Sequence, residues 1–451
     1  MTDPRPIAVD LFAGVGGMSL GFEQAGFDVV AALELDAAHA GAHTFNFPWC
    51  EVVRQDAALT TGDELRQAAA RGLRALGRRP EDAASIDVVF GGPPCQGFSV
   101  GGLNDPNDPR NGMVVEFARL VRELRPRAFV MENVPAMAST VLPQQDQAVP
   151  EWLAAELSDD GYTVSEPRVL NASWFGVPQD RRRLIVIGLR DNEGTPSFPA
   201  AKTLARRKTP HSRARPWEEG HPKAPALSLG PAVKDALAGI PDLDRFAELA
   251  VADEVALPDR FVRERDNLPS AYAAELDGRV RAPNDYSYSR QTDRHLLTSS
   301  LRTTHSAEVI ARFAATKPGQ SEAVSRFYRL HDDGVSGTLR AGSSPDRGSY
   351  SAPRPIHPAA DRVISVREAA RLSGFPDWFR FTAAKWHGFR QVGNAVCPPF
   401  ARAVAEAVRE SIGVTAVVPE GARALGPAAL LHVPSGAGRR PRRHIAAGTT
   451  G

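Results

Sequence analysis

Cys95 is the residue of this chain best placed for covalent chemistry. It lies in GGPPCQGFS, residues 91–99, directly after the short apolar run DVVF at 87–90. That run is typical of a buried strand in a parallel sheet, and the glycines and prolines that follow end it in a tight turn. Ligands of open α/β sheets bind beyond the carboxyl ends of the strands. A thiol there, beside backbone N–H groups, can have a lowered pKa and act as a nucleophile, although a lone cysteine is more often inert and buried.

Two further groups of ionisable residues adjoin apolar runs. Glu132 follows residues 128–131, and QDRRR at 179–183 precedes the run LIVI. Alternation along an extended segment places Arg181 and Arg183 on one side of the chain and Arg182 on the other. A run of three arginines is usually a solvated surface feature, but the adjoining apolar strand favours a functional role here. For Glu132 the competing interpretation is a carboxylate that only caps a following helix.

A glycine-rich turn, DLFAGVGG at 10–17, joins the first expected strand to the first expected helix. Glycines there let the backbone approach a ligand at the helix N-terminus. Glu34 ends the next strand, 20 positions after Gly14, where an acidic residue often binds ribose hydroxyls. Leu35 could lie against an adenine, and Asp56 could accept a hydrogen bond from its amino group. Alone, the turn is compatible with a dinucleotide, a nucleoside cofactor or a simple tight turn.

These residues need a framework in which strands and helices alternate. Apolar runs and periodicity predict strands at 7–11, 29–33, 52–53, 86–90, 128–131 and 184–189, and helices at 17–25, 114–124, 366–372 and 400–408. The alternation over the first 190 residues predicts an α/β fold with a doubly wound, mostly parallel, Rossmann-like sheet.

The character of the sequence changes near residue 191, where Pro, Arg, Ser and Gly interrupt the alternation. We therefore expect a catalytic domain at 1–190 that is completed by 385–415, and a second, smaller domain at 191–384. The segment 416–451 is rich in Ala, Gly, Pro and Arg, and we expect a flexible tail there.

Composition narrows the classes of protein further. The chain has 451 residues, 42% hydrophobic and 24% charged, with a formal net charge of +1, which neither indicates nor excludes a nucleic-acid partner. It has no apolar run near the ~20 residues of a membrane helix and no signal-peptide pattern at its N-terminus, so we expect a cytoplasmic protein. The three cysteines (Cys50, Cys95 and Cys397) form no CxxC pair, and His39 and His43 lack a third ligand, so we expect no metal site.

The motifs FAGVGG, ELD, GGPPCQGFS, ENV, QDRRR, REAARLSGFP and GNAVCPP, in this order, resemble those of the cytosine-5 DNA methyltransferases. The resemblance spans Ile7 to about Val408, apart from a variable interval at 191–350. It implies methyl transfer from S-adenosylmethionine, which leaves S-adenosylhomocysteine, to carbon 5 of a flipped cytosine in a specific sequence of double-stranded DNA. Residues 191–384 would then form the target-recognition domain.

The resemblance also implies a role for each catalytic candidate. Cys95 matches the nucleophile that adds to carbon 6 of cytosine. Glu132 matches the residue that holds ring nitrogen 3, and this role needs a carboxyl that is protonated or shares a proton, with a pKa raised by a dry pocket. Arg183 matches the arginine that contacts the base carbonyl. Arg181 would support the nucleophile loop or the flipped nucleotide.

By the same resemblance, a cofactor pocket forms around the glycine turn. Phe12 would pack on the adenine, Glu34 would bind the ribose and Asp56 would lie near the purine amino group, while Asn394 and Val396 would complete the pocket from the far end of the chain. The remaining candidates for cofactor contact are Asp10, Gly14, Gly16, Gly17, Leu35 and Pro93.

Candidates for DNA contact lie in two regions. Residues 100–113 have the composition of a loop that closes over the substrate, and Ser99 and Arg110 are candidates for phosphate contact. In the recognition region the candidates for base or phosphate contact lie at 290–294, 302–305 and 338–342. Ser373 stands where the family commonly has glutamine, which we expect to change local hydrogen bonding only.

Three other functions compete with this one. A transfer-RNA cytosine-5 methyltransferase would carry a Cys-Phe-Thr element in the recognition region, but no cysteine lies between Cys95 and Cys397. A nicotinamide-dependent oxidoreductase would leave Cys95 and Glu132 unexplained. A catalytically inactive DNA-binding relative is disfavoured because Cys95, Glu132 and Arg183 are all present. We therefore expect a bacterial modification methylase, monomeric, with a possible cognate restriction endonuclease.

Overall fold

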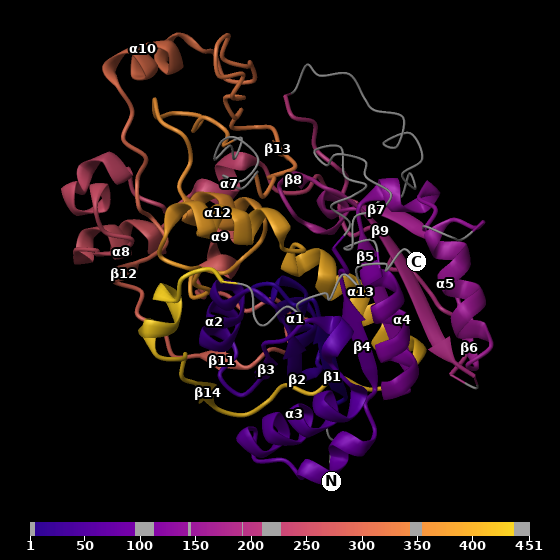
Figure 1. Ribbon diagram of the computed structural model, residues 1–451. Helices are drawn as coiled ribbons and strands as arrows, with labels where there is room; N and C mark the ends of the chain where they lie inside the picture. Colours follow the sequence, from indigo (N-terminus) through magenta and orange to yellow (C-terminus); the bar gives the residue numbers. More distant parts are fainter. Residues whose placement is uncertain are drawn as a thin grey trace, which may run out of the picture.

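The computed structural model describes residues 5–94, 112–142, 146–191, 193–209, 227–342 and 354–436. The strands of its main sheet are β1 (Ile7–Leu11), β2 (Asp28–Leu33), β3 (Glu51–Val53), β4 (Val88–Gly91), β5 (Ala128–Asn133), β6 (Tyr162–Val164), β7 (Arg168–Asn171) and β9 (Arg182–Arg190). Their order is β3-β2-β1-β4-β5-β9-β6, with β7 also paired to β9 (Figure 1).

The first five strands are parallel, whereas β9 runs antiparallel to β5, β6 and β7. Every residue of β1, β2, β4 and β5 is buried, as expected for strands covered by helices on both faces. The expected mostly parallel α/β sheet is therefore confirmed, and each of the six expected strands is present within two residues of its expected bounds. The short strands β6 and β7 were not predicted.

The helices that cover this sheet are α1 (Gly17–Gln24), α2 (Ala37–Asn46), α3 (Gly62–Ala75), α4 (Met113–Leu124), α5 (Val149–Ser158) and α13 (Pro398–Ser411). Helix α1 packs on α13, and α3, α4 and α5 pack on one another in sequence order. Gly21 of α1 makes the first contact close, since a Cβ there would lie 2.4 Å from that of Ala401. A helix from the far end of the chain thus completes the layer that begins with α1.

The second region has short elements and more irregular backbone. Its helices are α7 (Val233–Leu237), α8 (Asp259–Asp266), α9 (Ala271–Leu276), α10 (Ala307–Ala315) and α11 (Val366–Leu372), and α12 (Lys385–Asn394) leads from it to α13. Its strand pairs are β8 (Gln179–Asp180) with β13 (Ser336–Gly337), β10 (Val255–Ala256) with β12 (Leu296–Leu297), and β11 (Ser289–Arg290) with β14 (Ala422–Arg423). Single 3-10 turns are η1 (Ala57–Leu59), η2 (Pro80–Ala84), η4 (Pro135–Ser139), η5 (Ala172–Phe175), η6 (Leu243–Arg245), η7 (Ala247–Ala250) and η9 (Ala428–His432).

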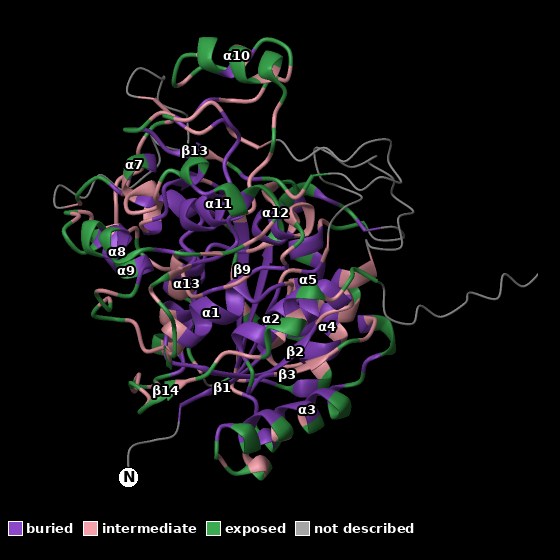
Figure 2. Cartoon of the chain, turned by 90° about the vertical axis from the view of Figure 1, so that its left-hand side faces the viewer, coloured by how far each residue is buried: buried purple, intermediate pink, exposed green. Residues whose placement is uncertain are grey.

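The hydrophobic core is continuous from the sheet into α11 and the aromatic group Phe375, Phe379 and Phe381. Figure 2 shows buried residues around the sheet and α11, and exposed ones on α10 and α3. Two smaller apolar clusters form around Phe246 and Phe261 and around Phe313 and Ile356. The second region therefore shares the main core and adds two small cores, and its expected boundaries stay a prediction.

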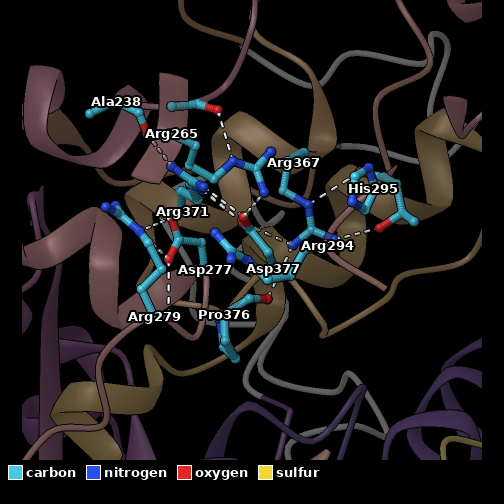
Figure 3. Close-up of polar contacts among 12 residues, drawn as sticks. Ala238, Arg265, Asp277, Arg279, Arg294, His295, Arg367, Arg371, Pro376 and Asp377 are labelled. Atoms are coloured by element: carbon cyan, nitrogen blue, oxygen red, sulfur yellow. Dashed lines mark hydrogen bonds and ion pairs between the residues drawn. The ribbon is translucent and has the colours of Figure 1, made fainter. Parts of the chain in front are cut away.

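A buried network of charges ties α11 to its neighbours (Figure 3). The Asp377 carboxylate accepts hydrogen bonds from Arg371 Nε and Nη2 at 2.8 and 2.6 Å, and Arg367 and Arg265 lie 3.9 and 4.0 Å away. Burial opposes ionisation of Asp377, but Arg371 and its neighbours lower the pKa of this carboxyl to about 2. Arg371 also donates to the carbonyls of Ala236 and Ala238 at the C-terminal end of α7. These arginines of REAARLSGFP therefore fix the second region on the core.

Residues 416–436 belong to the segment expected to be flexible, yet they pair with other parts of the chain. Strand β14 pairs with β11, and η9 packs on α2. The segment packs on the rest of the chain because Leu431, which lies within it, is buried and only 1% exposed. None of the helices that the structure describes is long and apolar enough to span a membrane.

Candidate active site

An ion pair between Glu132 and Arg183 lies at the carboxyl edge of the sheet. Because β9 is antiparallel, its first residues lie beside the last residues of β5, with Glu132 opposite Ile185. Arg183 Nε lies 2.7 Å from Glu132 Oε1, and the two side chains are 12% and 11% exposed. Charges this well shielded from water interact more strongly than surface ion pairs. The structure therefore brings together two of the four expected catalytic residues.

The chain that leads to Cys95 passes directly over this pair. Gly92 follows β4, and a Cβ added to it would lie 2.8 Å from Glu132 Oε2. Asn133 Nδ2 donates a 3.0 Å hydrogen bond to the Pro93 carbonyl, which fixes the turn beyond the strand. Cys95, Ser99 and Arg110 lie outside the described residues. The described part of the turn therefore passes directly beside the Glu132 carboxyl.

Arg181 is buried at the junction of β8 and β9. Its guanidinium group donates to the carbonyls of Leu339, Gly393 and Ala395 at 3.0, 2.9 and 2.8 Å. Burial, with Arg183 nearby, lowers the pKa of Arg181 to about 9. The described contacts therefore make Arg181 a link between the second region and the GNAV segment, a role that the sequence did not reveal.

The same junction is held by Gln179 and Thr338. Gln179 Nε2 donates to Ser373 Oγ at 2.9 Å, and its Oε1 accepts from the Leu339 N–H at 3.2 Å. Thr338 Oγ1 donates to the Asp180 carbonyl at 2.7 Å. Ser373, which departs from the family pattern, thus has Gln179 as a local partner, and the effect of this departure stays a prediction.

Glu34 lies against the glycine turn. Its Oε2 accepts from the Gly14 N–H at 2.8 Å, and its Oε1 accepts from the Asp36 N–H at 2.7 Å. Phe12 is half-buried in the turn with φ 60°. A Cβ added to Gly14 would meet nothing within 4 Å, so there is space beside the carboxylate. The turn and Glu34 are arranged as a nucleoside with free ribose hydroxyls would require.

The turn rests on a buried polar chain that the sequence did not reveal. Ser19 Oγ donates to Asp10 Oδ2 at 2.5 Å and lies 3.0 Å from His43 Nε2. Burial raises the pKa of Asp10 and lowers that of His43 to about 3, so the imidazole is neutral. The Asp10 side chain therefore supports the turn from inside. The sequence did offer a signal for the contact of His43 with Ser19, namely the spacing of His39 and His43 by four residues. We considered that pair only as possible metal ligands.

Close packing explains two glycines of the turn. Gly16 has φ 92°, and a Cβ there would lie 2.5 Å from Phe47 Cε2 and 2.9 Å from His43 Cδ2. A Cβ on Gly17 would lie 2.4 Å from the Val396 carbonyl oxygen. The GNAV segment therefore meets the glycine turn, with Val396 buried and Asn394 exposed.

The remaining cofactor candidates lie at the same edge. The Glu34 N–H donates to the Val53 carbonyl at 3.1 Å, which joins the ends of β2 and β3. Leu35 is half-buried beside Glu34. Asp56 follows β3 and uses Oδ1 to cap η1 through the Ala58 N–H at 3.1 Å. In the part of the chain that the structure describes, no group of three His, Cys, Asp or Glu residues could hold a metal ion.

One expected DNA contact is wrong. Arg290 was a candidate for base or phosphate contact, but its side chain is 1% exposed and pairs with Glu23, also 1% exposed, at 2.8 Å. Its guanidinium group also stacks on Trp49 and Trp378, 4.6 and 4.5 Å from the ring centres. Because Arg290 is buried together with the Glu23 carboxylate, its role is structural. Arg294 and Arg302 pair with Asp266 and Asp244, whereas Thr338 and Arg340 are exposed.

Comparison with known proteins gives the family. A model described as C-5 cytosine-specific DNA methylase matches residues 8–410. The chain belongs to this family. Membership implies S-adenosylmethionine as the methyl donor, and the predicted DNA (cytosine-5)-methyltransferase is confirmed in preference to the RNA-modifying alternative.

Two relatives and one solved structure are similar to this methylase over most of its length. The Type II methyltransferase M.XorII of Xanthomonas oryzae pv. oryzae is 44% identical over 430 residues, which are 95% of this chain and 90% of that protein. The Type II methyltransferase M.DdeI of Desulfomicrobium norvegicum is 30% identical over 427 residues, 89% of this chain and 88% of that one. A crystal structure described as a prophage-encoded DNA modification methyltransferase of E. coli matches with a TM-score of 0.65 and 29% identity, covering 90% of this methylase and 99% of that chain.

Proposed function

We propose that this methylase transfers a methyl group to carbon 5 of a flipped cytosine through a covalent adduct with Cys95. The observation that carries the proposal is the shielded Glu132–Arg183 pair directly below Gly92, because the turn to Cys95 begins there. The other two cysteines are poor nucleophiles, since Cys50 and Cys397 are buried and burial raises the pKa of both thiols.

The chemistry assigns each residue a task. Bound S-adenosylmethionine supplies an electrophilic methyl group, which carbon 5 of cytosine is too weak a nucleophile to accept unaided. The Cys95 thiolate adds to carbon 6, and the electron pair of the 5,6 double bond is drawn toward ring nitrogen 3, to which Glu132 gives a proton. Carbon 5 then takes the methyl group, and S-adenosylhomocysteine is the leaving group. A base removes the carbon 5 proton, nitrogen 3 returns its proton to Glu132, the 5,6 double bond returns and the thiolate leaves.

Arg183 serves this sequence by orienting Glu132 and contacting the base carbonyl, where negative charge develops. That Glu132 carries or shares the proton stays a prediction for the DNA complex. We assign removal of the carbon 5 proton to a water molecule. Arg181 acts as a positioning residue through its three backbone acceptors.

We place the cofactor along the carboxyl edge of β1, β2 and β3. Glu34 binds the ribose, Phe12 packs on the adenine beside Leu35, and Asp56 accepts from the purine amino group with its second oxygen. Asn394 and Val396 close the pocket across the glycine turn, where Gly14, Gly16 and Gly17 allow close approach, and Asp10 and Pro93 flank it. The space beside Gly14 and the anchored carboxylate of Glu34 support this placement.

We further propose that DNA binds between the catalytic domain and the recognition domain at 191–384. The target cytosine cannot reach a thiol while stacked in the duplex, so it is flipped, and Ser99 and Arg110 contact phosphates. The similarity to Type II methyltransferases supports a modification methylase of the bacterial cytoplasm, with a cognate endonuclease of the same specificity. We propose that it acts as a monomer.

Trapping on 5-fluorocytosine DNA tests the mechanism, because fluorine at carbon 5 blocks proton removal and leaves the adduct in place. Wild type is expected to form a denaturation-resistant complex in the presence of S-adenosylmethionine, and Cys95→Ala none. Cys50→Ala is the matched control and is expected to trap as wild type does. Bisulfite sequencing of host DNA gives the site. An adduct with Cys95→Ala, or methylation of adenine alone, would contradict the proposal.

A further inference from the structure

The described chain continues past α13 and past the end of the family match at residue 410. We call residues 416–436 the C-terminal clasp. It begins where Arg5 Nη1 donates to the Val417 carbonyl at 2.7 Å, and it continues through β14, which pairs with β11. The Gly426 N–H then donates to the Phe45 carbonyl at 2.8 Å. Figure 1 shows the clasp in yellow, passing beside α2.

The clasp is anchored on α2 by close packing. A Cβ on Gly41, in the middle of α2, would lie 2.6 Å from the Leu430 carbonyl oxygen. Leu431 is buried, and its carbonyl accepts from the Ala383 N–H at 3.0 Å. The position of η9 on the helix is therefore fixed, and the chain leaves it toward the N-terminus of α2.

Two hydrogen bonds join the end of the clasp to the first turn of α2. The Ala37 N–H donates to the Gly436 carbonyl at 3.1 Å, and Ser435 Oγ donates to Asp36 Oδ2 at 2.5 Å. Asp36 Oδ1 caps the helix by accepting from the N–H groups of Ala38 and His39 at 2.9 and 3.1 Å. Helix N-termini leave such N–H groups without intrahelical acceptors, and the clasp supplies one of the missing partners.

Asp36 is also bonded to Glu34. Its N–H donates to Glu34 Oε1, while Gly14 donates to Oε2. A continuous hydrogen-bonded chain therefore runs from Ser435 through Asp36 and Glu34 to the glycine turn. Asp36 remains a carboxylate acceptor, because His39, the Ser435 hydroxyl and Arg390 lower its pKa although burial acts in the opposite direction.

We propose that the C-terminal clasp is part of the cofactor site, with Asp36 as a positioning residue that holds Glu34 ready for the ribose of S-adenosylmethionine. The inference rests on the proposed role of Glu34. A carboxylate already held in its binding geometry loses less conformational freedom when the ligand arrives, so preorganisation strengthens binding without a new contact. The clasp thereby acts on cofactor affinity and leaves the methyl-transfer step unchanged.

A pair of truncations isolates the contact. One variant ends at Gly436 and keeps the two hydrogen bonds, whereas the other ends at Val433 and loses them together with Pro434. The shorter variant is expected to bind S-adenosylhomocysteine about fivefold more weakly by titration calorimetry without DNA, the loss that one or two hydrogen bonds represent. The longer variant is expected to match the full chain. Equal affinity in the two variants would overturn the proposal.

Point variants guard against misfolding of the truncations. Ser435→Ala is expected to raise the KM for S-adenosylmethionine about threefold at unchanged kcat, and Ser435→Thr to restore it. Ser411→Ala is the matched control, because it removes a serine hydroxyl bonded to Ala407 and Ser197 away from α2. A fall in kcat with unchanged KM for Ser435→Ala would contradict the proposed action on affinity.

Glu34→Ala separates this inference from the proposed function. If Glu34→Ala binds S-adenosylhomocysteine as wild type does, the proposed ribose contact is wrong. If Glu34→Ala weakens binding while Ser435→Ala and the shorter truncation do not, only the clasp proposal fails. If both hold, the effect of Ser435→Ala is expected to disappear in the Glu34→Ala background, since the clasp acts through Glu34.

Discussion

At the scale of single residues, Glu132 is held from two directions. Oε1 pairs with Arg183, while Oε2 faces the position that a Cβ on Gly92 would occupy. Arg183 therefore holds one oxygen of the Glu132 carboxyl, and Gly92 leaves room for the other oxygen because it has no side chain. The apolar runs beside them made Glu132 and the arginines of QDRRR candidates, and the resemblance to the cytosine-5 methyltransferases singled out Glu132 and Arg183. Local pattern could not show that Arg181 bonds to Leu339, since the two residues are 158 positions apart and most of the second region lies between them.

Arg183→Ala is expected to lower kcat by about 10²–10³-fold, the range seen when one donor to developing charge is removed. Affinity for S-adenosylhomocysteine is expected to stay within about twofold, because Arg183 lies at β9 and away from the glycine turn. Single-turnover methylation and calorimetry measure the two quantities. Arg182→Ala, on the opposite side of the same strand, is the matched control, and an equal loss of kcat there would argue against the assignment.

Asp253 gives stability a dependence on pH. Burial raises the pKa of Asp253 to about 7, against the lowering effects of Arg380, Arg367 and the backbone N–H groups of Leu301 and Ser299. The folded protein therefore holds this proton more tightly than the unfolded chain, whose aspartates titrate near 3.9. This contribution to stability is complete below about pH 4 and is lost as the pH rises to about 7.

Asp253→Asn is expected to be nearly equal to wild type at pH 3.5 and more stable at pH 7.5, by at most about 4 kcal/mol for a pKa difference of about three units, because the amide resembles the protonated carboxyl. Urea unfolding at the two pH values measures the difference. A variant less stable than wild type at pH 7.5 would show that the carboxylate form is the one that the fold stabilises.

At the scale of elements, the direction of a strand decides which of its residues lie at the active site. The antiparallel β9 places its first residues at the carboxyl edge of β5, where a parallel strand would have placed its last. The apolar run LIVI predicted a strand there, but nothing in the run indicates its direction. Strands β6 and β7 have three and four residues and a burial pattern mixed with exposed positions, so periodicity gave no signal for them. Long, fully buried strands such as β1 and β5 were predictable for the opposite reason.

Helix α12 approaches the recognition region closely at Gly393. A Cβ there would lie 2.4 Å from the Ala341 nitrogen and 2.5 Å from the Arg340 carbonyl carbon. Gly393→Ala is expected to cost about 1–3 kcal/mol of stability because backbone must move. Gly112→Ala is the control, since Gly112 has φ −71° and no atom within 4 Å of the added Cβ. Equal urea midpoints for the two variants would contradict the close approach.

At the scale of the whole molecule, ion pairs between distant segments hold the layers together. Glu23 of α1 binds Arg290 of β11, which in turn lies between Trp49 and Trp378. The segment 290–294 was a candidate for DNA contact, and for Arg290 this was wrong because nothing in the sequence shows that Glu23 is buried opposite it. Burial of a charge depends on partners far away along the chain, which is the class of information that local patterns lack.

Arg290→Ala is expected to cost about 3–5 kcal/mol of unfolding free energy, because it leaves the Glu23 carboxylate buried without its partner. Arg71→Ala is the matched control, because it breaks the ion pair of Arg71 with Glu51, in which the two side chains are 48% and 44% exposed. It should cost less than about 1 kcal/mol. Chemical denaturation of both variants measures the contrast. Comparable losses would mean that the Glu23–Arg290 pair is no more important than a surface one.

The three carbonyls that accept from Arg181 have a consequence for anyone wishing to retarget this methylase by grafting a recognition domain from a relative. The Arg181 guanidinium group donates to main-chain oxygens of Leu339, Gly393 and Ala395. These hydrogen bonds therefore do not depend on the side chains of the grafted segment. A chimera should therefore keep its catalytic geometry whenever the incoming backbone follows the same path across residues 337–341. The graft must also bring a partner for Glu23, because Arg290 lies within the exchanged segment.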